Sequence, residues 1–275
     1  MVSQIPKQTY PRPFLKWAGG KTRLISQYKD YFPKHYHTYY EPFLGGGAIF
    51  FSMQPSKAVL SDINADLITT YRCVKDNIEE LITLLQKHKQ EHNAEYYYDV
   101  RNNHSSKDLE IAARFIYLNK TCFNGLYRVN SQGKFNVPVG KYKNPGICQE
   151  EVLQVASQAL KGVEIKHANF DEVLNYATGI NDFVYFDPPY YPVSKTSNFT
   201  AYSHFSFDEN QQIKLRDIFA ELADRGVKVM LSNSDCPFIR DLYSDFSVHT
   251  ILAARSINSN AQKRGKITEV LVTSY

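Results

Sequence analysis

The chain has 275 residues, of which 43% are hydrophobic and 14% aromatic, and its formal net charge is +4. This length suits one α/β core with an inserted lobe. No run of eighteen apolar residues and no signal-peptide pattern occurs, so we expect a cytoplasmic protein without a membrane-spanning segment. The four cysteines form no CxxC pair, so they indicate neither a zinc site nor a disulfide framework.

The predicted elements alternate between helices and short apolar strands, as in an α/β fold. A helix is expected from Lys21 to Pro33, and an amphipathic helix over 208–225 with Gly226 as its stop. Residues 64–120 have the pattern of consecutive helices, followed by a loop-rich stretch with a hairpin turn at 131–133. This inserted helical lobe is expected to split the core. Strands are predicted at 38–41, 58–61, 163–166, 182–186, 227–232, 248–252 and 267–273.

Basic residues are concentrated in two segments that contain no acidic residue, residues 111–145 and residues 246–268. Two such segments in a nearly balanced chain indicate a polyanionic partner. A solvated surface is the alternative for either segment alone.

The segment FLKWAGGKT, residues 14–22, ends in Gly-Lys-Thr, as a phosphate-binding loop does. Such a loop requires a glycine five places before the glycine of that triplet, and Leu15 occupies this position. Pro11 and Pro13 are also incompatible with a preceding core strand. The spacing therefore argues against a nucleoside triphosphatase, and a glycine turn before a helix remains the alternative.

A second glycine-rich segment, EPFLGGG, follows an apolar strand that ends at Glu41. Its glycines stand where the first strand of a doubly wound sheet lets a ligand approach backbone N–H groups. Asp62 ends the next strand, where a carboxylate can accept hydrogen bonds from ribose hydroxyls. Phe50 replaces the third glycine of the dinucleotide fingerprint. These residues predict a ligand that contains adenosine without a pyrophosphate.

The motif Asp187-Pro188-Pro189-Tyr190 follows a predicted buried strand and is the strongest functional signal. Asp187 then lies at the carboxyl end of that strand, where α/β proteins bind ligands. The prolines enforce an extended backbone and leave carbonyls as acceptors. Asp187 and the Pro188 carbonyl could accept the two hydrogens of adenine's exocyclic amine while Tyr190 stacks on the ring. The alternative is a strand that ends in a rigid turn.

The segment His88-Lys89-Gln90-Glu91-His92 matches the HxxEH pattern of a zinc-peptidase class. It lies at the polar end of a predicted helix, where His and Glu are ordinary surface residues. We expect no metal there.

The motifs FLKWAGGK, EPFLGGG, SDIN and DPPY, in this order, resemble those of the Dam-type (class alpha, D12 family) DNA adenine-N6 methyltransferases. The resemblance spans nearly the whole chain and includes NGLYRVN, FNVPVGKYKNP, TSNFTAYSHFSF and RSINSN. It implies a Rossmann-like seven-stranded methyltransferase sheet with an inserted, mostly helical target-recognition domain that carries a β-hairpin. Residues 1–63 and 147–275 would form the catalytic domain, and residues 64–146 the DNA-binding domain.

The resemblance also implies a monomeric, metal-free enzyme that binds S-adenosyl-L-methionine and double-stranded DNA. Trp17 and Lys21 would line the cofactor site, Asp62 would bind the ribose, and Asp187 would lie beside the methyl group and the target amine. Asn169 stands where some members carry an acidic residue near the cofactor's adenine ring. The implied catalytic residues are Asp187, Pro188, Pro189 and Tyr190. The implied cofactor-binding residues are Trp17, Lys21, Glu41, Phe43, Gly45, Gly47, Asp62, Asn169, Phe170 and Asp187.

DNA recognition follows from the same resemblance. Arg128 matches an arginine that reads a guanine, the commonest specific contact in the major groove. Phe123 matches an aromatic wedge beside the extruded adenine; several members have Tyr there, so a phenolic hydrogen bond would be absent. Leu126 and Pro138 match contacts to thymine methyl groups. This set resembles that of a GATC reader. The implied DNA-binding residues are Lys16, Phe123, Asn124, Leu126, Arg128, Asn130, Asn136, Pro138 and Tyr142.

The sequence therefore predicts methylation of N6 of an adenine flipped out of duplex DNA by a cytoplasmic, nucleoid-associated enzyme. The alternatives are an RNA adenine or protein glutamine methyltransferase, a nucleoside triphosphatase and a catalytically silent DNA-binding module. Related glutamine-modifying sites carry Asn in place of Asp187, and the basic lobe favours duplex DNA. A restriction system, a phage and a solitary methylase remain equally open as contexts.

Overall fold

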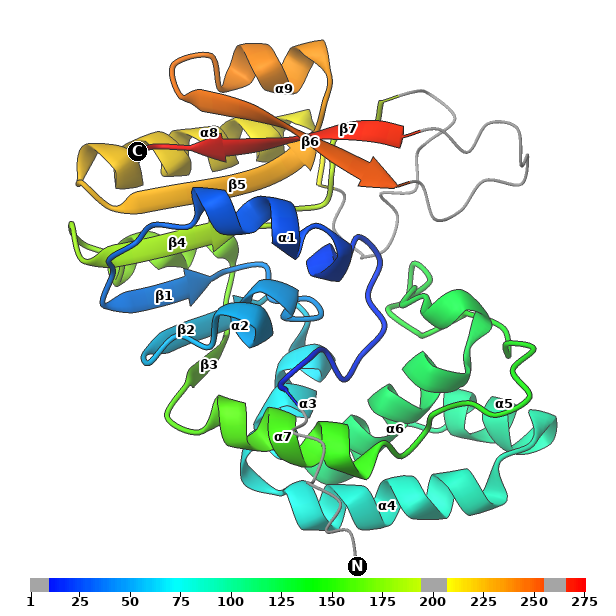
Figure 1. Ribbon diagram of the computed structural model, residues 1–275. Helices are drawn as coiled ribbons and strands as arrows, with labels where there is room; N and C mark the ends of the chain where they lie inside the picture. The colour runs from blue at the N-terminus through cyan, green and yellow to red at the C-terminus, as the bar shows by residue number, and fades with distance from the viewer. Residues whose placement is uncertain (1–9, 194–206, 255–265) are drawn as a thin grey trace, which may run out of the picture.

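A computed structural model describes residues 10–193, 207–254 and 266–275, which form a seven-stranded sheet with helices on both faces (Figure 1). The strand order is β3-β2-β1-β4-β5-β7-β6; β7 runs antiparallel to both of its neighbours and the other pairs are parallel. The predicted strands are confirmed, each within two residues of its expected bounds. The strands are β1 (Thr38–Glu41), β2 (Ala58–Asp62), β3 (Glu164–His167), β4 (Asp182–Phe186), β5 (Lys228–Ser234), β6 (Ser247–Ala254) and β7 (Lys266–Thr273).

Successive residues of the central strands pack into two different apolar clusters, because side chains of a strand alternate between its faces. Tyr39 and Leu60 belong to one cluster, whereas Tyr40 and Val59 belong to the other. Helices α2 (Ala48–Met53), α3 (Ala65–Asp76) and α7 (Glu150–Leu160) contribute to the first cluster, and α8 (Glu209–Asp224) and α9 (Pro237–Leu242) to the second. Both faces are therefore covered, which explains the continuous apolar runs of the parallel strands.

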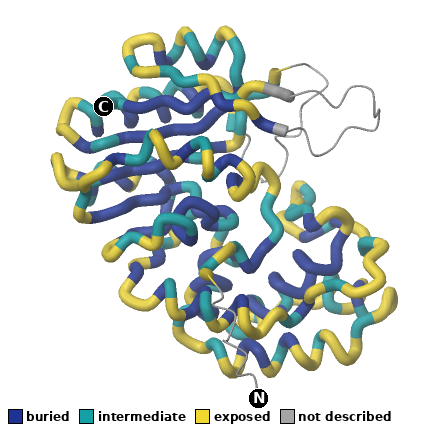
Figure 2. Tube along the Cα trace, in the orientation of Figure 1, coloured by how far each residue is buried: buried dark blue, intermediate teal, exposed yellow. Residues whose placement is uncertain are grey.

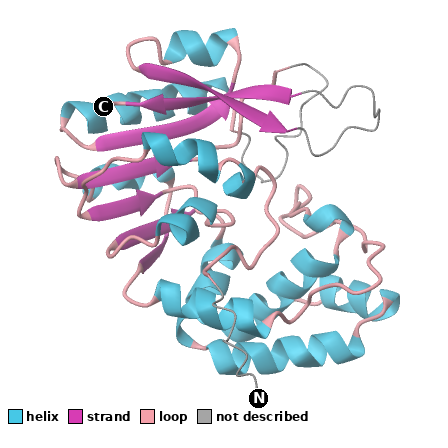
Figure 3. Cartoon of the chain, in the orientation of Figure 1, coloured by secondary structure: helices cyan, strands magenta, loops and turns pink. Residues whose placement is uncertain are grey.

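The predicted run of helices between the second and third strands is confirmed (Figure 3). It consists of α3, α4 (Ile78–Glu91), α5 (Ala94–Asn102) and α6 (Asp108–Thr121). The side chain of Asn64 caps α3 by accepting a hydrogen bond from Leu67 N, and Asn93 caps α5 in the same way. The outer helix surfaces are exposed while their inner faces are buried (Figure 2).

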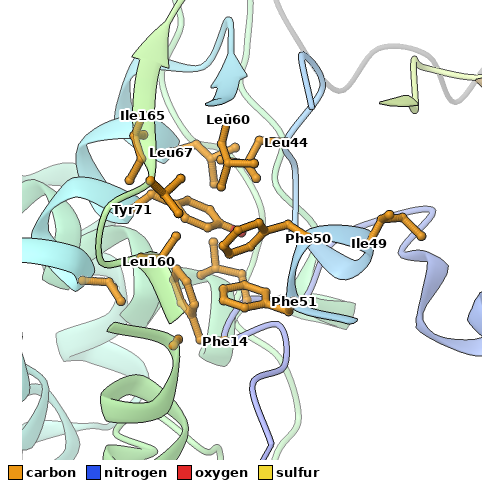
Figure 4. Close-up of a cluster of buried hydrophobic side chains, with 14 of the residues drawn as sticks. Phe14, Leu44, Ile49, Phe50, Phe51, Leu60, Leu67, Tyr71, Leu160 and Ile165 are labelled. Carbon is orange, nitrogen blue, oxygen red and sulfur yellow. The ribbon is translucent and has the colours of Figure 1, made fainter. Parts of the chain in front are cut away.

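The first apolar cluster extends from the sheet into these helices without interruption. Leu60 of β2 and Leu67 of α3 share it with Leu81 of α4 and Phe115 of α6. Figure 4 shows its centre, where Phe14, Phe51 and Tyr71 pack together. The split into residues 1–63 with 147–275 and residues 64–146 stays a prediction, and the buried core crosses its first boundary.

A 3-10 turn, η3 (Phe123–Gly125), follows α6, and the basic stretch after this turn folds back on itself. Asn130 N donates to Lys134 O, Gly133 N donates to Asn130 O, and Gly133 has a φ of 75°. The predicted turn at 131–133 is therefore confirmed, with glycine supplying the left-handed conformation. In the described part of the chain, β-pairing between its arms is limited to isolated bridges, Cys122 to Val139 and Val129 to Phe135.

The expected helix from Lys21 to Pro33 was wrong as a single element. The chain instead forms a 3-10 turn η1 (Lys21–Arg23), a short helix α1 (Ile25–Tyr28) and a second 3-10 turn η2 (Lys29–Tyr31). The first turn is closed by a tight bond from Leu24 N to Lys21 O of 2.8 Å. No side chain caps any of the three pieces, and Lys21 is buried. Packing thus overrides the helical pattern here.

The amphipathic helix expected over 208–225 is confirmed as α8. Asp208 caps it by accepting from Gln211 N, and Gly226 follows with a φ of 80°. Across 10–193, 207–254 and 266–275, no helix has the length and apolar character needed to cross a membrane. The motif segments 196–206 and 255–260, with Arg255, Lys263 and Arg264, lie outside the described residues.

Candidate active site

Three carboxylates lie at the carboxyl ends of adjacent parallel strands. Glu41 ends β1, Asp62 ends β2, and Asp187 directly follows β4. The strands β2 and β4 flank β1 on opposite sides, so the chain reverses its order at β1. Such a switch point opens a crevice in which α/β proteins bind ligands.

The two glycine-rich segments lie against each other at this switch point. Gly45 has a φ of 46°, and a Cβ there would lie 2.6 Å from Nε1 of Trp17. A Cβ on Gly46 would lie 3.1 Å from Cβ of Trp17. The Trp17 ring stacks on Tyr127 at 5.9 Å, with an angle of 21° between the ring planes. Glycines therefore allow the indole to rest directly on the loop backbone.

Asp62 connects this glycine loop to the end of β2. Its two carboxylate oxygens accept hydrogen bonds from Gly45 N and Asn64 N, both at 3.0 Å. Burial raises the pKa of Asp62, while these bonds favour its charged form. Each oxygen keeps a further lone pair, which a hydroxyl donor could use.

Glu41 is almost fully buried beneath the loop, with 2% of its surface exposed. One of its oxygens accepts from the hydroxyl of Tyr39 at 2.7 Å and from Phe50 N at 3.2 Å. Burial raises the pKa of Glu41 to about 8, and the nearby charges of Asp187 and Asp62 add to the shift. Because this pKa is close to neutral pH, a charge placed near Glu41 can change whether its carboxyl group is protonated.

Asp187 is held by Lys21, which belongs to the segment FLKWAGGKT, residues 14–22. Lys21 Nζ lies 2.8 Å from Asp187 Oδ1 and donates to Gly19 O at 2.6 Å. The Ser232 hydroxyl donates to the same Asp187 oxygen at 2.8 Å, and Tyr185 shares a hydrogen bond of 2.9 Å with Ser232. Within the described residues, Asp187 Oδ2 has no hydrogen-bond partner, so one oxygen remains available as an acceptor.

The rest of the DPPY motif is also fixed by hydrogen bonds. The Pro189 carbonyl accepts from Gln212 Nε2 at 2.9 Å, and the Tyr190 hydroxyl donates to Glu269 at 2.7 Å. Lys21 Nζ lies 4.6 Å from the centre of the Tyr190 ring, within cation–π range. The buried Pro188 keeps its carbonyl unbonded in the part of the chain that the structure describes. Two acceptors, Asp187 Oδ2 and Pro188 O, thus remain in one motif.

Two of the expected cofactor residues, Phe43 and Phe170, are aromatic. Phe43 stacks on Phe170 at 5.3 Å with an angle of 22°, and Phe207 meets both rings edge-on. Asn169 caps the 3-10 turn η4 (Phe170–Asn175), because its Oδ1 accepts from Phe170 N at 2.8 Å. Its amide oxygen is therefore already engaged. Gly47, with a φ of 64°, is the N-cap residue of α2.

The expected DNA-reading residues other than Lys16 lie on the segment after α6, and Tyr127 of this segment stacks on Trp17 of the crevice. Arg128 is exposed, and its Nε donates to Asn136 Oδ1 at 2.8 Å. The Asn130 side chain is used within the turn, where it accepts from Gln132 N and Lys134 N. Arg128 and Asn136 therefore form one exposed unit, whereas Asn130 has a local structural role.

A second group of these residues gathers near η3. Lys16 Nζ lies 3.9 Å above the ring of Tyr142 and 3.3 Å from Lys120 O. Phe123 is 50% exposed, and Asn124 adopts a left-handed conformation with a φ of 56°. Leu126 is half-buried and Pro138 is exposed on the same segment. The half-exposed Phe123 ring is accessible to a binding partner.

The two histidines of the HxxEH segment serve packing rather than the surface that the sequence indicated, whereas Glu91 is exposed as expected. Both rings are half-buried: His88 Nδ1 lies 2.8 Å from the Tyr96 hydroxyl, and His92 Nδ1 lies 2.9 Å from the Tyr117 hydroxyl. Burial lowers the pKa of His88 to about 4. Throughout the described ranges, no group of three or more His, Cys, Asp or Glu side chains is placed to hold a metal ion.

Sequence reasoning missed the polar residues that surround the DPPY motif. Ser232 and Asn233 lie in β5, Gln212 lies in the first turn of α8, and Glu269 lies in β7. The available signal was Ser232-Asn233-Ser234, three polar residues at the end of an apolar strand beside β4. Buried polar residues need hydrogen-bond partners. Such a run beside the strand that precedes the DPPY motif therefore indicates residues that bond to the motif.

Comparison with known proteins identifies the family. Residues 17–257 match the sequence model of the D12 class N6 adenine-specific DNA methyltransferases. The chain belongs to this family. It is therefore an adenine-specific DNA methyltransferase, and both the predicted family and the predicted enzyme class are confirmed. The nucleoside triphosphatase alternative is excluded.

Relatives align along nearly the full length of the chain. The type II methyltransferase M1.LlaDCHI of Lactococcus lactis subsp. cremoris is 46% identical, with 96% of this chain and 95% of that protein covered. M.MjaIII of Methanocaldococcus jannaschii, also named a type II methyltransferase, is 42% identical, with coverages of 96% and 99%. The DNA adenine methylase of Escherichia coli strain K12 is 38% identical, with both coverages at 94%.

Proposed function

We propose that this methyltransferase transfers the methyl group of S-adenosyl-L-methionine to N6 of an adenine that is flipped out of duplex DNA, within the sequence GATC. The observation that carries this proposal is that Asp187 Oδ2 and Pro188 O have no hydrogen-bond partner among the described residues, whereas Asp187 Oδ1, the Pro189 carbonyl and the Tyr190 hydroxyl are bonded. The enzyme acts as a monomer, with residues 64–146 reading the DNA.

The residues of the switch point fit this cofactor. Trp17 lies on a loop that only glycine can form, as shown by the 2.6 Å approach to a Cβ built on Gly45. The cationic Lys21 suits the carboxylate of the methionine part, and Glu41 suits its amino group. Asp62 retains lone pairs for the ribose hydroxyls. The stacked Phe43 and Phe170, next to Asn169, offer an apolar wall for the adenine ring, as expected for a small-molecule site.

Asp187 and Pro188 orient the target amine. When bound, the cofactor supplies an electrophilic methyl group on a sulfonium centre. Adenine N6 carries two hydrogens and a lone pair that is delocalised into the ring. Acceptance of both hydrogens by Asp187 Oδ2 and Pro188 O draws the nitrogen toward tetrahedral geometry and localises its lone pair. Lys21 and Ser232 hold the opposite carboxylate oxygen, so the acceptor is fixed before the base arrives.

Tyr190 fixes the plane of the flipped base. Its hydroxyl is tied to Glu269 of β7, and the cation of Lys21 lies against its ring. A ring restrained at both its edge and its face offers a defined stacking surface. Gly45, Gly47 and Pro189 act through the backbone shape that they impose.

Arg128 reads a guanine of GATC, and Phe123 occupies the space that the adenine leaves. Leu126 and Pro138 contact thymine methyl groups, and Lys16, Asn124, Asn136, Asn130 and Tyr142 complete the DNA surface. The exposure of Arg128 and Phe123 supports these roles. The acid-free segment 111–145 supplies phosphate contacts, so affinity should fall steeply with salt concentration.

The decisive experiment replaces the acceptor. Asp187→Ala should lower the single-turnover rate of methyl transfer by on the order of 10³-fold or more, because the amine loses its main orienting contact. Tritiated methyl incorporation into a GATC duplex measures this rate, and Asp224→Ala, an exposed carboxylate at the end of α8, is the control. Incorporation near the wild-type rate in Asp187→Ala would refute the assigned role.

The substrate is tested separately with the unaltered enzyme. GATC duplexes should incorporate label, whereas duplexes with one substituted base and RNA of the same sequence should incorporate far less. Preferential labelling of RNA, or equal labelling of the substituted duplexes, would overturn that part of the proposal.

A further inference from the structure

Two buried amides beside the DPPY motif have no role in the chemistry described so far. Gln212 and Asn233 come from different elements, α8 and β5, and both are 0% exposed. Burial of an amide costs free energy unless its donors and acceptors are bonded. A buried amide pair next to a reactive loop therefore calls for a reason beyond packing.

The hydrogen bonds of the two amides run in one direction. Asn233 Nδ2 donates to Gln212 Oε1 at 2.9 Å, and Gln212 Nε2 donates to Pro189 O at 2.9 Å. At the other end, Asn233 Oδ1 accepts from Tyr191 N at 3.1 Å and from Ser234 N at 2.8 Å. The pair thus binds the carbonyl before Tyr190 and the N–H after it.

The composition of the motif explains why side chains are needed. Pro188 and Pro189 have no N–H, so this turn cannot secure itself with backbone donors as ordinary turns do. Gln212 and Asn233 supply the missing partners, and the Ser234 hydroxyl adds a bond of 2.6 Å to Tyr191 O. The position of Tyr190 between two anchored peptide groups follows from these bonds.

Only one orientation of the two amides satisfies every partner. The Pro189 carbonyl is an acceptor, so the NH₂ group of Gln212 must face it and Oε1 must face Asn233. The NH₂ group of Asn233 must then face Gln212, which leaves Oδ1 for Tyr191 N. Reversal at either amide places two like groups against each other.

We propose that Gln212 and Asn233 are positioning residues that set the geometry of Pro188 O and Tyr190 for the flipped adenine. This inference rests on the proposed function, in which that motif holds the target base. Both amides are 0% exposed, so they are expected to act on the base through the motif rather than by direct contact. Their loss should lower the rate of methyl transfer and leave the affinities for S-adenosyl-L-methionine and for duplex DNA within about twofold.

The substitution Gln212→Glu gives a readout that a merely structural role would not show. An ionised carboxylate would repel Pro189 O, whereas a protonated one can donate to Pro189 O and still accept from Asn233 Nδ2. Burial raises the pKa of a carboxyl group, so protonation should occur as the pH is lowered from 8.5 to 6. The single-turnover rate of Gln212→Glu should recover over this range.

The matched control is Gln212→Met, which has a similar volume and cannot donate at any pH. Its rate should stay low across the range, on the order of 10²-fold below wild type, as expected for a small misplacement of reacting groups. The other titratable residues of the site, Asp187, Tyr191, Glu209 and Glu41 with its pKa of about 8, are common to both variants, so the ratio of the two rates isolates the new carboxyl group. Ser157→Ala, which removes a buried hydrogen bond of α7, controls for stability alone.

A constant ratio between the two variants, or rates within twofold of wild type at every pH, would overturn the inference. If Gln212→Glu fails to fold, the same comparison is made between Gln212→Met and Asn233→Ala, which should show the same low rate with unchanged affinities. Asp187→Ala separates the two levels: an active Asp187→Ala refutes the proposed function, whereas an inactive one together with fully active amide variants refutes this inference alone.

Discussion

The carboxyl edge of the sheet and the segment after α6 are built in opposite ways. At the sheet edge, Lys21 and Glu41 are 3% and 2% exposed, and each is bonded to its neighbours. On the other segment, Phe123 is 50% exposed and Tyr142 is 37% exposed. Among the described residues, the exposed Arg128 is bonded only within the segment, to Asn136.

Under the proposed function, this difference follows from what each region does. Groups that orient a reacting amine must be in place before the substrate arrives, because rearrangement during the reaction raises the barrier. Groups that read base edges must remain free to bond to DNA. Changes at the sheet edge should therefore affect folding and chemistry together, whereas changes on the segment should affect specificity alone.

The largest expected effect in this comparison concerns Glu41 and pH. Its pKa of about 8 in the folded protein exceeds the unfolded value of 4.5, so the folded state binds the extra proton. The contribution of Glu41 to the free energy of unfolding should therefore fall as the pH rises from 4.5 to 8, by on the order of 4 kcal/mol, and then level off. Urea unfolding of wild type and Glu41→Gln measures the difference, which should widen toward low pH in favour of wild type.

Glu95→Gln, an exposed carboxylate on α5, is the control for this experiment. A pH profile of Glu41→Gln that is parallel to that of wild type would show that Glu41 is not the group responsible.

The ion pair at the edge should give the next largest effect. Lys21→Met leaves the partly buried Asp187 without its cation, and stability should fall by roughly 2–4 kcal/mol, discounted because 21% of the Asp187 side chain is exposed. Lys107→Met breaks an exposed pair with Glu110 and should cause no measurable change. Equal effects of the two substitutions in urea unfolding would contradict the distinction between the regions.

Two left-handed glycines separate backbone strain from crowding by Trp17. Gly162 has a φ of 78° and open space where a Cβ would lie, whereas a Cβ on Gly45 would lie 2.6 Å from Nε1 of Trp17. Alanine at either position should cost about 1–2 kcal/mol for the backbone alone, and Gly45→Ala should cost about 1 kcal/mol more. Thermal unfolding with and without S-adenosyl-L-methionine tests this, and only Gly45→Ala should lose stabilisation by the cofactor.

The smallest effect on stability is expected for a substitution on the segment after α6. Arg128→Ala should change the free energy of unfolding by less than about 0.5 kcal/mol, because the side chain is exposed. It should nonetheless reduce discrimination at the guanine by about 1–3 kcal/mol. Methylation rates on GATC and on duplexes with that guanine replaced measure the change. A uniform loss across all duplexes would identify Arg128 as a phosphate contact instead.

Local pattern was sufficient to locate the strands and the ends that carry Glu41, Asp62 and Asp187. Buried parallel strands read as short apolar runs, and their carboxyl ends coincide with polar residues. The turn at Gly133 was also predictable, because its positive φ demands glycine.

What the sequence could not supply are contacts between distant segments. The pairing of Lys21 with Asp187 and the chain from Asn233 through Gln212 to Pro189 depend on how α8, β5 and the opening turn cross in space. The single helix expected after Lys21 was wrong for the same reason, since tertiary packing outweighed its local pattern. The half-buried His88 was likewise hidden within an apparently polar helix end.

The apolar cluster that joins the sheet to α3, α4 and α6 has a mechanical consequence. A core shared in this way resists rotation of the helices against the sheet. If Arg128 and Asp187 have their proposed roles, the distance between them is then largely set by the fold. Under the proposed function, the DNA must therefore deform until its guanine reaches Arg128 and its adenine reaches Asp187.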